Sequence, residues 1–150
     1  LSKGLCAPVG SILAGPADFI ECARKNRKIL GGGMRQAGIL AAAALVGLEE
    51  MVDRLADDHA NARLLAERLA EIDGLEVDMA GVQSNIVRFG LVKRGVTVQQ
   101  VVAAGAAEGV RFNAMDAAHF RAVTHYGIER DDVEHAAAVI RRVLQNVTAA

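Results

Sequence analysis

The segment AGILAAAALVGL, at positions 37–48, constrains the fold of this chain more than any other stretch. As a helix it is apolar round most of its circumference, so it has to be covered on several sides. Buried helices of mixed α and β proteins find that cover on a β-sheet. Residues 1–70 nevertheless predict mainly helix, with one short buried strand, VGSILAG, at positions 9–15. The sequence therefore predicts that the covering sheet is absent from this chain.

Proline and glycine set the expected helix boundaries. Pro16 begins the helix PADFIECARKNRKIL, which ends at Gly31, the first residue of a glycine triplet. From Met34 to Ile72 the apolar residues recur at helical spacing, which predicts one long helix, straight or kinked. Its first part is apolar and its later part half-exposed. We therefore expect this helix to leave one domain and enter another.

From about Leu75 onward, shorter alternating elements predict an α+β unit with its own core. Thr97 and Gln100 form a capping box that opens a helix ended by Gly109. The expected strands are LEVDMA, SNIVRFGL, VRFNAM and HFRAVTHYGI. A last helix begins near Asp131 or Asp132, and its core face is expected to carry Val133, Ala137, Ile140 and Leu144.

The composition is that of a soluble globular protein, with 52% hydrophobic and 23% charged residues among 150. The formal charge of −1 gives no field that would attract nucleic acid or an anionic membrane, and no apolar run is long enough to span a bilayer. The spacing of Cys6 and Cys22 fits no metal motif. We expect both cysteines to be reduced, as in a cytoplasmic protein, and to be packed as small residues.

A lysine among small residues opens the chain, in LSKGLCAPVGSILAG. At the end of a buried strand, Lys3 would be desolvated and would have room beside Ser2 and Gly4 for a bulky aldehyde, with which a neutral amine forms an imine. The alternative is a solvated loop lysine. The residues of this stretch alone leave both interpretations open.

The longer motifs around Lys3 resemble a known enzyme family. The words SKGLCAPVGS and RKILGGGMRQAG are similar to the segment of the low-specificity threonine aldolases that carries the lysine of pyridoxal 5′-phosphate. The resemblance continues through DDHANARLLAERL and QSNIV and ends in FRAVTH, so it covers nearly the whole chain. It implies an α/β enzyme of fold type I, like aspartate aminotransferase, of which this chain is the second part.

The resemblance also implies a division of the chain and a cofactor. Residues 1–47 correspond to the end of the large cofactor-binding domain, 48–74 to a connecting helix and 75–150 to the small C-terminal domain. Lys3 corresponds to the lysine that holds pyridoxal 5′-phosphate. The sheet-bearing first half would be on the same or a companion chain, with the catalytic base and the groups that contact the cofactor ring.

Further site residues are carried over from the same family. Arg121 corresponds to the arginine that binds the substrate carboxylate, a role suited to a planar guanidinium; the alternative is a solvated edge-strand arginine. Lys28 and Arg35 correspond to positions near the cofactor phosphate or the subunit boundary. The glycine triplet between them either approaches that phosphate or only stops a helix. His125 is expected on the same strand face as Arg121, where a structural role is the commoner outcome.

The implied activity is cleavage of L-threonine, L-allo-threonine or related β-hydroxy-α-amino acids to glycine and an aldehyde by a homodimer or homotetramer. A noncatalytic fragment or assembly module, and another fold-type I lyase, are the alternatives. A nucleic-acid binder is a weaker one, because the basic cluster at positions 24–28 lacks aromatic neighbours for base stacking.

Overall fold

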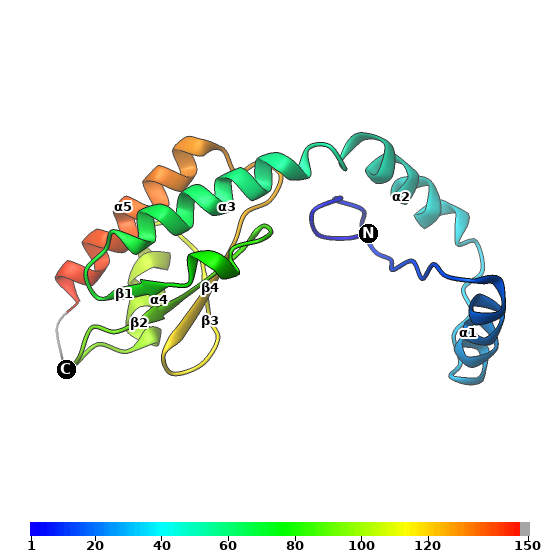
Figure 1. Cartoon of the computed structure of the whole chain (residues 1–150), viewed down its shortest axis with the longest axis horizontal. Coiled ribbons are helices and arrows are strands. Elements are labelled where there is room, and N and C mark those ends of the chain that lie inside the picture. The colour runs from blue at the N-terminus through cyan, green and yellow to red at the C-terminus, as the bar shows by residue number, and fades with distance from the viewer. Residues whose placement is uncertain (148–150) are drawn as a thin grey trace. The chain divides into compact units, whose positions relative to one another are not determined.

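The computed structural model describes residues 1–147, which divide into two compact units between Arg54 and Leu55. Unit 1 contains helices α1 (Ala17–Ile29) and α2 (Gly38–Glu50). Unit 2 contains all the strands of the described residues, three further α-helices and a short 3-10 helix (Figure 1). The division of the chain into 1–47, 48–74 and 75–150 remains a prediction.

Helix α1 has the boundaries that proline and glycine predict. It begins directly after Pro16 and ends at the glycine triplet, where Gly31 adopts a left-handed φ of +85°. The Gly31 N–H donates to the Lys28 carbonyl at 3.1 Å, which satisfies one of the last carbonyls of the helix. The structure therefore supports the helix-stop interpretation of this triplet.

The rest of unit 1 buries little of its apolar surface. Helix α2 buries only Ala44 and Gly47, and α1 buries no residue. Gly47 lets the first loop approach α2 closely, because a Cβ there would lie 2.7 Å from the Leu5 carbonyl oxygen. The prediction of a buried strand at 9–15 was wrong: this segment is an exposed coil, and within the described residues it has no strand to pair with.

The expected single helix over 34–72 was also wrong, because the chain forms two helices there. Helix α2 ends at Glu50 and α3 (Leu55–Ala70) begins at the unit boundary, with a turn between them. Met51 keeps near-helical dihedral angles, φ −107° and ψ −12°. The apolar spacing therefore continues across the turn, and periodicity could not reveal the break.

Unit 2 is built on a four-stranded antiparallel sheet in the order β1-β2-β4-β3. The strands are β1 (Leu75–Val77), β2 (Ile86–Leu91), β3 (Asn113–Ala114) and β4 (His119–Val123), with a short 3-10 helix, η1 (Met79–Gly81), after β1. They coincide with the four predicted segments, although β3 is much shorter than VRFNAM.

Helices cover one face of this sheet. Helix α3 packs against β1, β2 and α5 (Arg130–Asn146), and α4 (Val98–Ala107) packs against α5 and β3. Arg68 of α3 and Glu134 of α5 form a bidentate ion pair, with nitrogen–oxygen distances of 2.8 and 2.9 Å. Lys93 donates to the Leu144 carbonyl and to that of Val147 at 3.2 Å, so it caps the end of α5.

Three phenylalanines fill the space between sheet and helices. The rings of Phe89 and Phe120 stack at 4.8 Å, and Phe112 meets Phe120 edge-on at 5.5 Å. The predicted core face of the last helix is confirmed, since all four residues named for it are buried. The capping box of Thr97 and Gln100 is confirmed as well.

The cysteines differ from expectation. Both Cys6 and Cys22 are free thiols, but both are exposed rather than packed, because each lies in unit 1, which buries few side chains. In the described part of the chain, no helix is both long and apolar enough to cross a membrane.

The phenylalanine cluster makes the stability of unit 2 testable. Phe120→Ala should lower the free energy of unfolding by about 3–5 kcal/mol, because Phe120 is fully buried and its loss leaves a cavity between sheet and helices. Val92→Ala, at a position 53% exposed, is the matched control and should change it by less than about 0.5 kcal/mol. Urea unfolding followed by circular dichroism measures both. Equal effects of the two changes would contradict the packing described here.

Candidate functional site

Lys3 lies in a closed loop at the start of unit 1. The Leu1 nitrogen donates to the Gly10 carbonyl at 2.8 Å, and the Ala7 N–H donates to the Leu1 carbonyl at 3.3 Å. A tight turn inside this ring is closed by the Cys6 N–H, which donates to the Lys3 carbonyl at 2.9 Å. The described residues on either side of Lys3 are loop, so the strand end expected at Lys3 is not seen among them.

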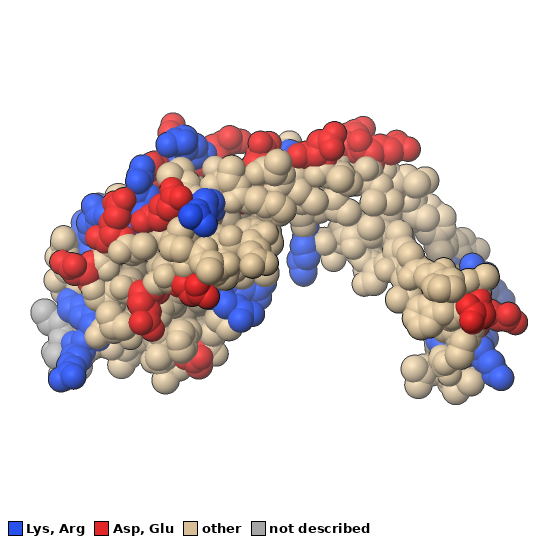
Figure 2. Space-filling view, viewed as in Figure 1, with Lys and Arg blue, Asp and Glu red and all other residues tan. Residues whose placement is uncertain are grey.

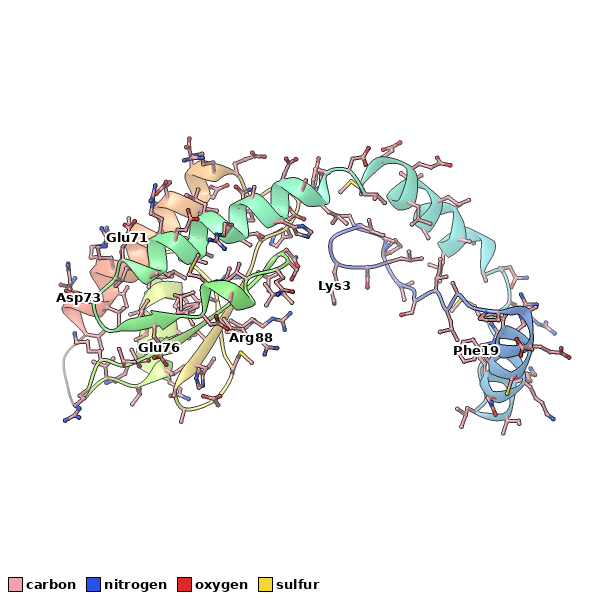
Figure 3. All side chains as sticks on the ribbon, viewed as in Figure 1. Lys3, Phe19, Glu71, Asp73, Glu76 and Arg88 are labelled. Carbon is pink, nitrogen blue, oxygen red and sulfur yellow. The ribbon has the colours of Figure 1, made fainter. Side chains whose placement is uncertain are left out.

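The backbone of Lys3 is strained. Its φ is +81°, in the left-handed region that side chains other than glycine rarely adopt, and Cys6 in the same turn has a φ of +58°. Such a conformation costs of order 1 kcal/mol and is concentrated at functional sites. The Lys3 side chain is exposed and points away from the loop (Figure 3). The loop thus presents a primary amine between the small residues Ser2 and Gly4.

Lys28 and Arg35 flank the glycine triplet in unit 1, as the sequence requires. The Lys28 ammonium lies over Gly33, where an added Cβ would come within 3.3 Å of the Lys28 Nζ. Arg35 is exposed in the turn before α2, beside Gln36, whose φ is +54°. Helix α2 begins only at Gly38, so the triplet itself does not form the N-terminus of that helix.

Arg121 lies in unit 2, on the sheet face opposite the helices. The burial pattern of β4 alternates, with Phe120 buried toward the core and Arg121 and Val123 exposed on the other face. Arg121 and Val123 thus share one face of the strand, as the alternation predicts. Among the described residues, the Arg121 guanidinium has no acidic partner within ion-pair distance and donates no hydrogen bond, so it is available for an anionic ligand.

Arg88 is a candidate that the sequence analysis missed. It stands directly opposite Arg121 in the pairing of β2 with β4, so the two side chains share the open face of the sheet. Arg88 is exposed and, like Arg121, has no ion-pair partner among the residues described. The signal was present in SNIVRFGL, where Arg88 lies between Val87 and Phe89 on a strand whose alternate residues face the core.

Buried hydrogen bonds fix the end of β4. Thr124 is 2% exposed, and its Oγ1 donates to the Asp58 carbonyl of α3 at 2.6 Å. Its N–H donates to the Asn85 carbonyl at 3.0 Å, and the Asn85 side chain donates to the Thr124 carbonyl at 2.7 Å. These bonds attach β4 to both α3 and the residue before β2. They hold the strand that carries Arg121 in one position.

The histidines near Arg121 have defined partners. His125 is exposed beyond the end of β4, and its Nδ1 donates to the Tyr126 carbonyl at 2.8 Å. His119 contacts the Asp116 carboxylate, which also accepts the Ala118 N–H at 2.8 Å. The Ala118 hydrogen bond, followed by that of His119, holds the pKa of the Asp116 carboxyl below its usual range. Within residues 1–147, no group of three or more His, Cys, Asp or Glu side chains could hold a metal ion.

Known proteins match this chain along most of its length. It is 40% identical over 154 residues to a probable low-specificity L-threonine aldolase 2 of Arabidopsis thaliana, covering 97% of this chain and 41% of the relative. It is 41% identical over 144 residues to the low specificity L-threonine aldolase of Escherichia coli K12, covering 96% of this chain and 41% of that protein. The chain thus spans about two fifths of the length of these relatives.

The fold matches as well. A crystal structure of a putative aromatic amino acid beta-eliminating lyase/threonine aldolase from Exiguobacterium sp. 255-15 superposes with a TM-score of 0.73 at 22% identity, over 95% of this chain and 43% of that one. This confirms the α/β fold of the fold-type I enzymes. Residues 1–91 match the family described as beta-eliminating lyase. The chain therefore belongs to the beta-eliminating lyase family, and within it is similar to the low-specificity L-threonine aldolases.

Proposed function

We propose that this chain is the C-terminal part of a pyridoxal 5′-phosphate-dependent aldolase that cleaves L-threonine or L-allo-threonine, and related β-hydroxy-α-amino acids, to glycine and an aldehyde. The observation that carries the proposal is Lys3, an exposed lysine held at a φ of +81° inside the segment that matches the lyase family. The unpartnered Arg121 supports it independently, because an amino acid substrate brings a carboxylate. The names of the relatives support the choice of substrate class.

The residues present fit the cofactor. An aldehyde such as pyridoxal 5′-phosphate condenses with a primary amine, and the Lys3 loop presents one beside small residues that leave room for a ring. Lys28, with its ammonium over Gly33, is one group of unit 1 that could offer charge to a phosphate, and Arg35 is a second. When bound, the cofactor supplies an electron sink for bond cleavage at the substrate Cα.

The contribution of Arg121 is orientation. Two parallel N–H donors of a guanidinium fit one carboxylate and fix its plane as well as its position. With the carboxylate held, the Cα–Cβ bond of the substrate keeps one direction while a base takes the proton of the β-hydroxyl. Because Thr124 anchors β4 to α3, the backbone that carries Arg121 does not have to be ordered when substrate binds.

A second candidate function is that of a noncatalytic assembly module, and the exposed apolar surface of unit 1 favours it. Another fold-type I lyase is a third, which the family match leaves open. The absorbance spectrum of the purified 150-residue chain mixed with pyridoxal 5′-phosphate distinguishes a cofactor-binding chain from a noncatalytic module. A band near the visible edge that Lys3→Ala removes would support a cofactor site, and the spectrum of the free aldehyde alone would support the module.

Lys3→Ala in the full-length enzyme should abolish acetaldehyde release from threonine while the protein still folds, because the exposed side chain fills no core. After borohydride treatment, mass spectrometry should find the cofactor on the peptide that contains Lys3 in the wild type and nowhere in the variant. Lys25→Ala, at an exposed lysine of α1, is the control and should keep both properties. Near-normal cleavage by Lys3→Ala would remove Lys3 from the mechanism.

Arg121→Ala should weaken amino acid binding by roughly 2–5 kcal/mol and leave cofactor binding unchanged, because a carboxylate clamp contacts the substrate alone. Substrate titrations and the visible spectrum of the bound cofactor measure the two effects separately. Arg94→Ala, at another exposed arginine of unit 2, is the matched control and should change neither. An altered cofactor spectrum with unchanged substrate affinity would contradict the assignment.

The proposal includes assembly into at least a homodimer, in cytoplasmic surroundings that suit two free thiols. Much of the surface of unit 1 in Figure 2 is neither acidic nor basic, and Ile39 and Leu45 of α2 are 76% and 56% exposed. Apolar surface of this extent is covered by a partner or leads to aggregation. We expect the cover to be the preceding part of the enzyme together with a second copy.

Introducing a charge on α2 tests this assembly. Leu45→Glu should raise the dissociation constant of the full-length dimer at least about tenfold, because an interface would have to desolvate the new carboxylate. Val92→Glu in unit 2, at a position of similar exposure, should leave it unchanged. Sedimentation equilibrium measures both variants. A fully active monomeric wild type at micromolar concentration would refute the proposal.

A further inference from the structure

The open face of the sheet carries two arginines where the proposed reaction needs one. Arg88 and Arg121 are directly opposed across β2 and β4, and residues opposed in this way have Cα atoms about 4.5–5.5 Å apart. Like charges directly opposite each other destabilise a sheet. Val87, Phe89 and Gly90 are the buried residues of β2 and Arg88 is exposed, so packing of the core gives no reason for a cation at position 88.

The nearby carboxylates do not neutralise this pair. Glu76 of β1 lies across Gly90, where an added Cβ would meet its Oε1 at 2.7 Å. Asp78 accepts the Ala80 N–H at 3.0 Å and caps η1. Both acids line shallow hollows together with Arg88, yet neither comes within ion-pair distance of it. Figure 3 shows Arg88 and Glu76 on the same sheet.

The other charged groups on this face are also engaged. His119 is the register partner of Gly90, two residues before Arg121, and its ring contacts the Asp116 carboxylate at 2.9 Å. That carboxylate also accepts the backbone N–H groups of Ala118 and His119. The two arginines therefore stand side by side in the register of β2 with β4, and among the described residues neither has an ion-pair partner. They offer positions for two anionic groups or for two oxygens of one.

We propose that Arg88 is a specificity-determining residue that binds a carboxylate on the substrate side chain, beside the α-carboxylate held by Arg121. This inference rests on the proposed aldolase function. The substrate class is the β-hydroxy-α-amino acids with a second carboxylate, of which 3-hydroxyaspartate is the smallest. Its two carboxylates are separated by two carbons, a span that two long side chains on adjacent strands can match. Threonine, with a methyl group at that position, leaves Arg88 without a partner.

The reaction on such a substrate is balanced without any further reactant. The Cα–Cβ bond of 3-hydroxyaspartate breaks, its electron pair remains on Cα and takes up a proton, and the β-hydroxyl loses a proton as its carbon becomes an aldehyde. The products are glycine and glyoxylate. Arg88 takes no part in bond making or breaking. It binds the side-chain carboxylate, which becomes the carboxylate of glyoxylate.

The test compares two substrates in the full-length enzyme. Arg88→Gln should lower kcat/KM for 3-hydroxyaspartate at least about tenfold and change that for threonine less than about twofold, because only the first substrate has a group for Arg88. Arg94→Gln is the matched control and should leave both values unchanged. A wild type that does not favour 3-hydroxyaspartate, or an Arg88→Gln variant that loses both activities equally while keeping its melting temperature, would overturn the inference.

A binding measurement separates this inference from the proposed activity. In calorimetric titrations of the wild type, aspartate should bind more tightly than alanine, and Arg88→Gln should reduce the ratio of the two affinities to near one. That result would uphold the role of Arg88 even if the wild type failed to cleave threonine, which would defeat the aldolase proposal alone. Equal affinities of the wild type for aspartate and alanine would overturn the role of Arg88.

Discussion

The burial of one face of the sheet in unit 2 determines the rest of its structure. Phe89 and Phe120 are paired in the register of β2 with β4, and their rings stack at 4.8 Å in the core. Side chains alternate along a strand, so anchoring these two rings fixes the direction of their neighbours Arg88 and Arg121. A shift of one residue in either strand would expose its phenylalanine ring and bury its arginine. The core therefore positions the arginines without contacting them.

The polar groups buried at the end of β4 fix the position of the strand end, which the apolar core alone does not. Hydrophobic packing is not directional, whereas the hydrogen bonds of Thr124 to Asp58 and Asn85 require one placement of the strand end. Leaving any of these groups unpaired in the interior would cost about 1–3 kcal/mol. The strand is thus held at one end by hydrogen bonds and along its length by the phenylalanine cluster.

The two units differ in how far the sequence alone could predict them. In unit 2 the core is formed within the unit, so the capping box of Thr97, the strand alternation and the face of the last helix all had local causes that the sequence displays. In unit 1 the strand expected at 9–15 is absent and the long helix is broken at Met51. The hydrophobicity of a segment does not identify the surface against which it packs. A turn with near-helical dihedral angles does not interrupt the helical spacing of the apolar residues.

The residues of the candidate site also differ in how far the sequence could predict them. From the sequence, alternation could place Arg121 on the same strand face as Val123, and the burial of Phe120 in the structure shows which face that is. Lys3 could be singled out only by its resemblance to a family, since its strained φ of +81° is invisible in the residues around it. Arg88 was missed for another reason: its importance comes from the register of two strands more than thirty positions apart in the sequence, which no single segment contains. Pairing across a sheet, rather than any motif, is what places the two arginines side by side on one face.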